Sequence, residues 1–229
     1  MLSSAPGPAP AAARARIAAF FDLDNTLVPG QAIEVRFFRF LWTQRVIGAS
    51  EALRSLAHVL RRVPPLSLHP LRLRKLYLEG KNAAVIEPLA LQFVRASVRL
   101  SREGLAALER HRAAGHHLVL NTGAPDFLAA PLAASLRVDT VLAAVPERDG
   151  GGTYTGKLSG PLPYGAGKRH LVELFVKEHD IALEHSHAYG DSPGDLETLE
   201  LVGHPLVVNP IRGMGRIARR RGWPIVSWK

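Results

Sequence analysis

The chain has no cysteine, and only 2 of its 229 residues are methionine and 3 are tryptophan. The lack of cysteine excludes disulfides and thiolate metal sites. No uninterrupted apolar run approaches the roughly 18–20 residues of a membrane-spanning helix, so we expect a soluble, cytoplasmic protein. Residues 1–16 are rich in Ala and Pro and lack the long apolar segment and the many positive charges of a signal peptide. We expect them to form a disordered tail.

Negative charge is scarce in one part of the chain. Residues 34–102 contain 13 Lys or Arg but only 4 Glu, whereas the remainder holds 16 basic and 16 acidic residues. The whole net charge of +9 therefore lies in this part. Its apolar residues recur at helical spacing in four groups: Phe37, Phe38 and Leu41; Leu53, Leu56 and Leu60; Leu71, Leu76 and Leu78; and Leu89, Phe93 and Val94. The pattern predicts a small helical module over residues 31–100.

Helices and strands alternate after residue 100. Ser101 can cap a helix that ends at Gly115. The expected strands are 117–121, 140–143, 187–190 and 206–208, with a tight loop at 122–125, a hairpin over 145–158 and helices at 102–114, 166–179 and 213–221. This alternation predicts an α/β fold with a doubly wound, mostly parallel, Rossmann-like sheet. Residues 17–30 and 101–229 would form its core, with residues 31–100 inserted as a cap after the first strand.

The first strand ends in two acidic residues. An apolar run from Ile17 to Phe21 precedes Asp22 and Asp24, and side chains two apart in an extended chain point to the same side. Both carboxylates should meet at the carboxyl end of a central strand, where open α/β sheets bind ligands. One Asp could attack phosphorus while the other, its pKa raised by its neighbour, transfers a proton. The alternative is a pair of solvated acids that begin a turn.

Two later positions could bind a phosphoryl group. Thr122 and Gly123 follow the predicted second strand, and a hydroxyl with adjacent backbone N–H groups suits phosphate oxygens. Lys168 begins a helix and could neutralise charge on the phosphoryl group and on Asp22. The alternatives are a helix-capping threonine and a solvated surface lysine.

A second acidic pair follows the strand at 187–190. Asp191 ends this strand, and Asp195 lies four residues on, in the turn before a helix. Mg²⁺ prefers hard oxygen ligands and keeps several waters. Asp22, the backbone carbonyl of Asp24 and Asp191 could supply the protein ligands, with Asp195 orienting a water or Lys168. A purely structural Asp turn is the alternative.

These motifs, in this order, resemble those of the haloacid dehalogenase-like hydrolase superfamily. The sequence Asp22-Leu-Asp24-Asn-Thr26 is followed by Thr122, Lys168 and Gly190-Asp191-Ser-Pro-Gly-Asp195. The spacing is similar to that of the phosphoserine-phosphatase-like branch, subfamily IB, and the resemblance covers residues 17–227.

The resemblance implies a Mg²⁺-dependent phosphomonoesterase that forms an aspartyl-phosphate. Asp22 would be the nucleophile and Asp24 the general acid and then base. Thr122, Gly123 and Lys168 would bind the phosphoryl group, and Asp191 would hold the metal. Phosphoserine phosphatases carry a Glu about nine residues after the nucleophile, to read the substrate amine. Gln31 stands there in this chain, and Glu34 is out of register, so phosphoserine itself is not predicted as the substrate.

The histidines offer possible metal pairs in His116-His117 and in His185-Ser-His187. Their spacing does not support a zinc site, and we expect structural or surface histidines.

Three function classes stay open: a phosphatase, a phosphotransferase with the same chemistry, and a basic binding protein with a relic catalytic site. The expected substrate is a phosphorylated small molecule or a lipid headgroup. The basic module could contact an anionic membrane peripherally through Arg61-Arg62 and the following Pro64-Pro65-Leu66. No specific nucleic-acid partner is predicted.

Overall fold

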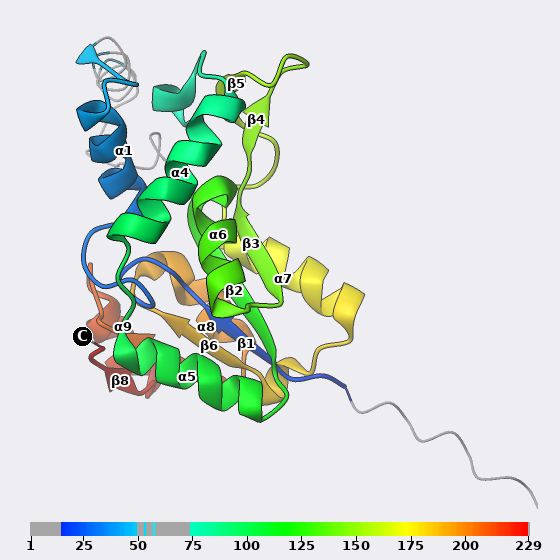
Figure 1. Cartoon of the computed structure of the whole chain (residues 1–229). Helices are drawn as coiled ribbons and strands as arrows, with labels where there is room; N and C mark the ends of the chain where they lie inside the picture. The colour runs from blue at the N-terminus through cyan, green and yellow to red at the C-terminus, as the bar shows by residue number, and fades with distance from the viewer. Residues whose placement is uncertain (1–14, 50–52, 54–56, 58–73, 229) are drawn as a thin grey trace, which may run out of the picture.

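A six-stranded parallel sheet forms the centre of the computed structural model, which describes residues 15–49, 53, 57 and 74–228 (Figure 1). The strand order is β3, β2, β1, β6, β7, β8, and every neighbouring pair is parallel. The strands are β1 (Ala18–Phe21), β2 (His117–Pro125), β3 (Thr140–Ala144), β6 (His187–Gly190), β7 (His204–Val208) and β8 (Ile225–Val226). The α/β fold class predicted from the sequence is confirmed.

Strand β1 contributes to the core on both faces of the sheet, because its successive side chains point in opposite directions. Ala19 and Phe21 belong to one buried cluster, and Ala18 and Phe20 belong to the other. The first cluster includes residues of α5 (Arg102–Ala113) and α6 (Asp126–Leu136), and the second includes residues of α7 (Ala166–His179), α8 (Leu196–Leu201) and α9 (Met214–Arg221). Burying each phenylalanine contributes about 1.5–3 kcal/mol.

Two helices begin where the sequence offers a capping side chain. Ser101 Oγ accepts a hydrogen bond from Gly104 N at the start of α5, and Asn82 Oδ1 accepts one from Ala84 N at the start of α4 (Ala83–Ser97). Each cap satisfies a backbone N–H that has no partner within its helix. The predicted end of α5 is also confirmed, because Gly115 follows it at φ +73°, which favours glycine.

The inserted segment contains fewer described helices than its pattern predicted. Helices α1 (Ile33–Thr43) and α4 match the first and fourth predicted groups. The third predicted helix is wrong where it can be seen, because Leu76–Leu78 form a single 3₁₀ turn, η1, which is followed by Gly80 at φ +78°. Leu56, Leu60 and Leu71, and the Arg61–Leu66 segment, lie outside the described residues.

The predicted hairpin is present and packs against this inserted segment. Its strands are β4 (Pro146–Arg148) and β5 (Tyr154–Leu158). Lys75 N donates to Gly156 O at 2.8 Å, and Gly80 N donates to Tyr154 O at 2.9 Å. In Figure 1 the hairpin lies with α1 and α4 at one end of the molecule. The division into a core and a cap at residues 31–100 stays a prediction.

Two other expectations from the sequence need correction. Residues 122–125, predicted as a tight loop, continue strand β2, with an irregular register against β3 between Asn121 and Pro125. The predicted tail reaches too far, because Arg16 N bonds Asp180 O at 2.9 Å; residues 1–14 lie outside the described part. No helix among the described residues is both long enough and apolar enough to cross a membrane.

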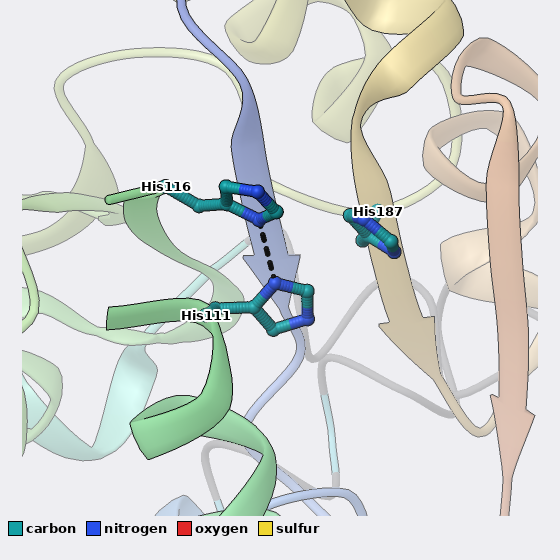
Figure 2. Close-up of side chains that lie close together, drawn as sticks. All are labelled: His111, His116 and His187. Atoms are coloured by element: carbon teal, nitrogen blue, oxygen red, sulfur yellow. Dashed lines mark hydrogen bonds between the residues drawn. The ribbon is translucent and has the colours of Figure 1, made fainter. Parts of the chain in front are cut away.

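Histidines gather at the amino ends of the strands. Figure 2 shows His111, His116 and His187 side by side, with a hydrogen bond of 2.8 Å between the Nδ1 atoms of His111 and His116. The pairs noted in the sequence do not form as pairs, because His117 Nε2 instead contacts Thr140 Oγ1 and His185 is exposed. The grouping comes from three separate segments of the chain.

Candidate active site

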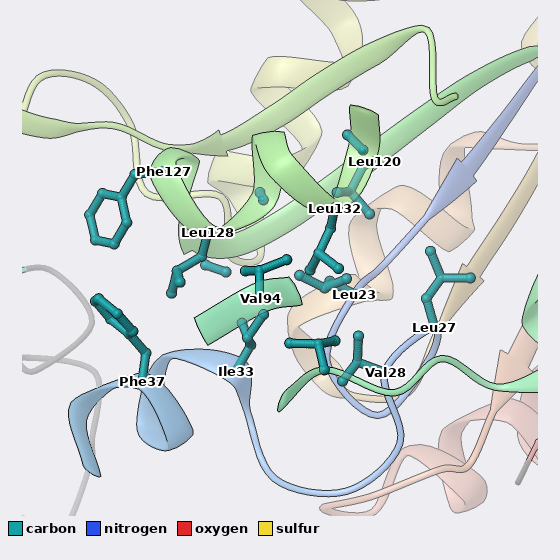
Figure 3. Close-up of a cluster of buried hydrophobic side chains, with 14 of the residues drawn as sticks. Leu23, Leu27, Val28, Ile33, Phe37, Val94, Leu120, Phe127, Leu128 and Leu132 are labelled. Atoms are coloured by element: carbon teal, nitrogen blue, oxygen red, sulfur yellow. The ribbon is translucent and has the colours of Figure 1, made fainter. Parts of the chain in front are cut away.

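The loop after β1 is fixed by apolar anchors beneath it. Leu23, Leu27 and Val28 are at most 1% exposed and point into the cluster shown in Figure 3. Asn25, between them, takes a left-handed conformation at φ 57°, and its N–H bonds Val28 O at 2.7 Å. This tight loop holds Asp22 and Asp24 at the carboxyl end of the central strand, as the sequence predicted.

Lys168 joins two carboxylates of the site. Its Nζ donates to Asp22 Oδ1 at 2.6 Å and to Asp195 Oδ1 at 2.5 Å. All three side chains are buried. Burial would lower the pKa of Lys168, but the charges of Asp195 and Asp22 outweigh it and raise that pKa above its ordinary value. Lys168 is therefore charged, and the alternative of a solvated surface lysine is excluded.

Asp195 is held in place by the turn that precedes α8. Its Oδ2 accepts hydrogen bonds from Asp191 N, from Ser192 N and from Ser192 Oγ, at 3.0–3.2 Å. Since Oδ1 is already bound to Lys168, both carboxylate oxygens have partners. Asp195 thus positions Lys168, one of the two roles that the sequence suggested for it.

A third carboxylate completes an acidic group. Oxygen atoms of Asp22, Asp191 and Asp195 lie within 4.8 Å of one another. Burial, with the charge of Asp195, raises the pKa of Asp191 to about 6, although a 2.9 Å hydrogen bond from Asn25 Nδ2 opposes the shift. Burial and then Asp195 also raise the pKa of Asp22 well above its usual value, against the opposing charge of Lys168. Three carboxylates beside one ammonium leave an excess of negative charge and hard oxygen donors, which fits Mg²⁺.

Asp24 stands apart from this acidic group. Its Oδ1 accepts a hydrogen bond from Ile33 N, the first residue of α1, at 2.7 Å. Burial raises its pKa above the usual value of a carboxyl group, despite that bond. A protonated fraction nearer neutral pH is what a general acid needs.

A pocket of about 450 Å³ opens over these residues. The sequence-predicted residues Asp22, Asp24, Gly123, Lys168 and Asp195 all border it. Much of the remaining lining is apolar or aromatic and comes from the inserted segment and from the loop before α7, namely Ala32, Val35, Phe38, Leu76, Tyr77, Leu162, Pro163 and Tyr164.

Thr122 lies beside the pocket rather than on its surface. It is 1% exposed, and its Oγ1 accepts a hydrogen bond from Ala124 N at 3.1 Å. Among the described residues that line the pocket, Gly123 and Ala124 are present and Thr122 is absent. The bond from Ala124 N lies within strand β2 and caps no helix, and phosphate binding by Thr122 stays a prediction.

Two acceptor side chains of the inserted segment, Glu34 and Gln31, are already paired. Glu34 Oε2 accepts from the buried Lys75 Nζ at 2.6 Å. Gln31 Oε1, in the position where phosphoserine phosphatases carry Glu, accepts from a guanidinium NH of Arg39 at 2.6 Å. Glu34 borders the pocket as a compensated ion pair rather than as a lone carboxylate.

A model of the haloacid dehalogenase-like hydrolase family matches residues 19–200. The chain belongs to this family. It is 31% identical to the phosphoserine phosphatase SerB1 of Mycobacterium tuberculosis over 220 residues, which cover 93% of this chain and 71% of that protein. A probable phosphatase of the same organism, Rv3661, is 28% identical over 228 residues, covering 96% and 78%. A solved structure from Bordetella pertussis, a protein of unknown function, superposes with a TM-score of 0.78 at 28% identity and covers 93% and 98%.

The resemblance inferred from the motifs is thus confirmed, and the chain is a hydrolase of this family. Asn25 and Asn209 are also parts of the site, and neither was predicted from the sequence to have a role there. Asn25 Nδ2 bonds both Asp191 Oδ2 and Asn209 O, and Asn209 Nδ2 bonds Asn25 O at 2.8 Å. The sequence does contain a signal for Asn209, because this residue directly follows strand β7, just as Asp22 follows β1 and Asp191 follows β6.

Proposed function

We propose that this hydrolase is a Mg²⁺-dependent phosphomonoesterase that forms an aspartyl-phosphate on Asp22. One observation carries the proposal: Asp22 lies buried at the end of the central strand, and Lys168 donates to only one of its two carboxylate oxygens. No described residue donates a hydrogen bond to the other oxygen, Oδ2. Oδ2 is therefore the atom available to attack phosphorus.

Asp24 is the proton donor in this proposal. As Asp22 Oδ2 bonds to phosphorus, the bond from phosphorus to the ester oxygen breaks, and the leaving alkoxide takes the proton of Asp24. A water then attacks the aspartyl-phosphate and gives a proton to Asp24, which restores both carboxyl groups and releases phosphate. The hydrogen bond from Ile33 N fixes the orientation of Asp24 for both transfers.

Lys168 balances charge throughout these steps, because its ammonium stays bound to Asp22 while negative charge builds on the phosphoryl oxygens. Gly123 borders the pocket. Its backbone lies close to that of Pro163, since a Cβ added to Gly123 would be 3.3 Å from Pro163 O. We assign the backbone at Thr122 and Gly123 to phosphoryl binding.

Asp22 and Asp191, with the backbone carbonyl of Asp24, would hold Mg²⁺. When bound, the cation supplies positive charge that lets the anionic ester approach the carboxylates. Asn25 orients Asp191 for this role through its 2.9 Å hydrogen bond.

The substrate is a small or headgroup-type phosphate ester. A similar protein carries the name phosphoserine phosphatase, but the pairing of Glu34 with Lys75 removes the free carboxylate that an amine would seek. Val35, Phe38 and Tyr77 favour an alcohol with an apolar part.

The test is release of inorganic phosphate from a panel of esters that includes phosphoserine, glycerol phosphate and an aryl phosphate, with Mg²⁺ or with EDTA. Asp22→Asn should abolish turnover and remain folded, and beryllium fluoride should form its adduct on Asp22 in the wild type. Asp180→Asn, an exposed Asp outside the site, is the matched control. Phosphatase activity that survives in Asp22→Asn would refute the nucleophile.

Added alcohols separate hydrolysis from phosphotransfer. If transfer to an alcohol outruns phosphate release at equal saturation, the phosphotransferase alternative replaces the phosphatase. If no ester turns over with Mg²⁺, the relic-site alternative replaces both.

A further inference from the structure

We propose that His111, His116 and His187 form a second metal site, one for a borderline divalent cation such as Zn²⁺. One nitrogen from each imidazole lies within 4.8 Å of the others. The three rings come from the end of α5, the turn before β2 and the first residue of β6 (Figure 2). This site goes beyond the proposed phosphatase activity and shares no residue with it.

The site lies at the amino ends of the strands, whereas the carboxylates lie at the carboxyl ends. His187 begins β6, and Asp191 follows the end of the same strand. At about 3.3 Å per residue, the two positions are about 13 Å apart along the strand. Oxygen ligands at one edge suit Mg²⁺, whereas an all-imidazole set at the other suits Zn²⁺, Ni²⁺ or Cu²⁺. The two sites should therefore select different cations.

A buried tyrosine orients one of the proposed ligands. Tyr189 OH lies 2.7 Å from His111 Nε2, and its ring stacks on Phe21 at a centroid distance of 4.5 Å. When Nε2 carries the proton and donates to this hydroxyl, His111 Nδ1 presents its lone pair toward His116. Metal-binding histidines ordinarily use their second nitrogen in this way.

Histidine must be neutral to bind a metal, and burial of these rings acts against their protonated form. Burial, with help from nearby histidines, lowers the pKa of both His111 and His187 to about 4. Burial also lowers the pKa of His116. Arg110 is the charged neighbour that adds to the shift at His111.

The ring positions need only a small rearrangement. Two nitrogen ligands of a tetrahedral zinc ion lie about 3.3 Å apart, given Zn–N bonds of about 2.0–2.1 Å. The 2.8 Å contact between His111 and His116 must therefore open by about 0.5 Å, and the other separations, which are no more than 4.8 Å, must close by at most about 1.5 Å. The rings of His116 and His187 are stacked, with their centroids 5.4 Å apart. A metal ion binds a ring nitrogen in the plane of the imidazole, so coordination would require these side chains to rotate about χ2 and give up the stacking.

An open cavity gives access and a fourth ligand position. His187 and Tyr189 border a cavity of about 820 Å³, together with the exposed His204. The His204 ring lies 4.6 Å from that of His187. His204 or a water can complete the tetrahedron from this side.

The experiment is a calorimetric titration of the full-length chain with Zn²⁺ while Mg²⁺ saturates the carboxylate site. We expect one equivalent of Zn²⁺ to bind, and thermal unfolding to move to a higher temperature with Zn²⁺. His116→Gln and His187→Gln should each weaken binding at least about tenfold, and Tyr189→Phe by about 10–100-fold. His185→Gln, an exposed histidine on the turn before β6, is the matched control and should bind as the wild type does.

Substitution of Co²⁺ gives an independent readout, because a tetrahedral nitrogen site produces intense visible absorption bands. These bands should be present in the His185→Gln control and absent from His187→Gln. Circular dichroism without metal establishes that each variant is folded, and His116 and His187 are both at half-buried positions. No Zn²⁺ binding by the wild type, or binding equal to the wild type in both His116→Gln and His187→Gln, would overturn the proposal. Phosphate release is not part of the readout, so the result is independent of the proposed catalytic activity.

Discussion

Lys168 Nζ lies 2.6 Å from Asp22 Oδ1, and both side chains are buried. The same ammonium also bonds Asp195, so it is the shared counter-charge of two carboxylates. Removing it would leave these acids without compensation in a buried site. Loss of Lys168 should therefore affect both the folding stability of the protein and its catalytic activity.

Lys168→Met should therefore destabilise the metal-free protein by about 3–5 kcal/mol, the cost of breaking a buried ion pair. It should also remove phosphatase activity. Urea denaturation in EDTA measures the first effect, and phosphate release measures the second. Lys177→Met, at an exposed position of the same helix, should change neither.

The double variant Lys168→Met/Asp195→Asn checks the physical reason. With one acid neutralised, part of the lost stability should return while activity stays absent. A double variant no more stable than Lys168→Met would show that packing of the lysine, rather than its charge, is what matters.

Asp24→Asn should slow turnover of alkyl phosphates by about 10²–10⁴-fold, the usual contribution of a general acid. Aryl phosphates should lose less, because their leaving groups need no proton. The ratio of kcat/KM for the two ester classes is the measurement. An equal loss for both classes, or a larger loss of Mg²⁺ affinity than in Asp191→Asn, would contradict the proton-transfer role.

The contribution of His111 and His187 to the folding stability of the metal-free protein should fall as the pH drops from about 6.5 toward 4. Burial lowers the pKa of His111 and His187 to about 4, whereas in the unfolded chain they titrate near 6.5. Between these values the unfolded chain binds more protons, so the stabilisation present above the unfolded pKa is lost on acidification. Urea denaturation in EDTA at a series of pH values measures the slope. His187→Gln should flatten it and His185→Gln should not.

The basic segment remains a prediction from the sequence. If Arg61 and Arg62 contact an anionic surface, the chain should sediment with liposomes in proportion to their anionic lipid content and release at high salt. Arg61→Glu/Arg62→Glu should abolish this sedimentation. Binding that does not depend on salt concentration, or no binding at all, would indicate that the basic segment is only a solvated surface.

Most of the fold followed from local pattern. The apolar run before Asp22, the Ser101 cap and the alternation after residue 100 each depend on neighbours in the sequence, and each appears as expected. The prediction failed where distant contacts decide the local conformation. Residues 122–125 extend strand β2 beside β3, and η1 forms where backbone bonds to β5 hold the chain around it.

The candidate site divides in the same way. The sequence alone determined which residues end the strands, because the change from apolar to acidic at Asp22 and Asp191 is visible without coordinates. Only the tertiary structure decided how they are paired. It set Lys168 between Asp22 and Asp195, linked Asn25 to Asn209, and brought together His111, His116 and His187 from three segments. The physical reason is that hydrogen bonds and burial depend on separation in space, and parallel strands bring residues more than 160 positions apart to the same edge of a sheet.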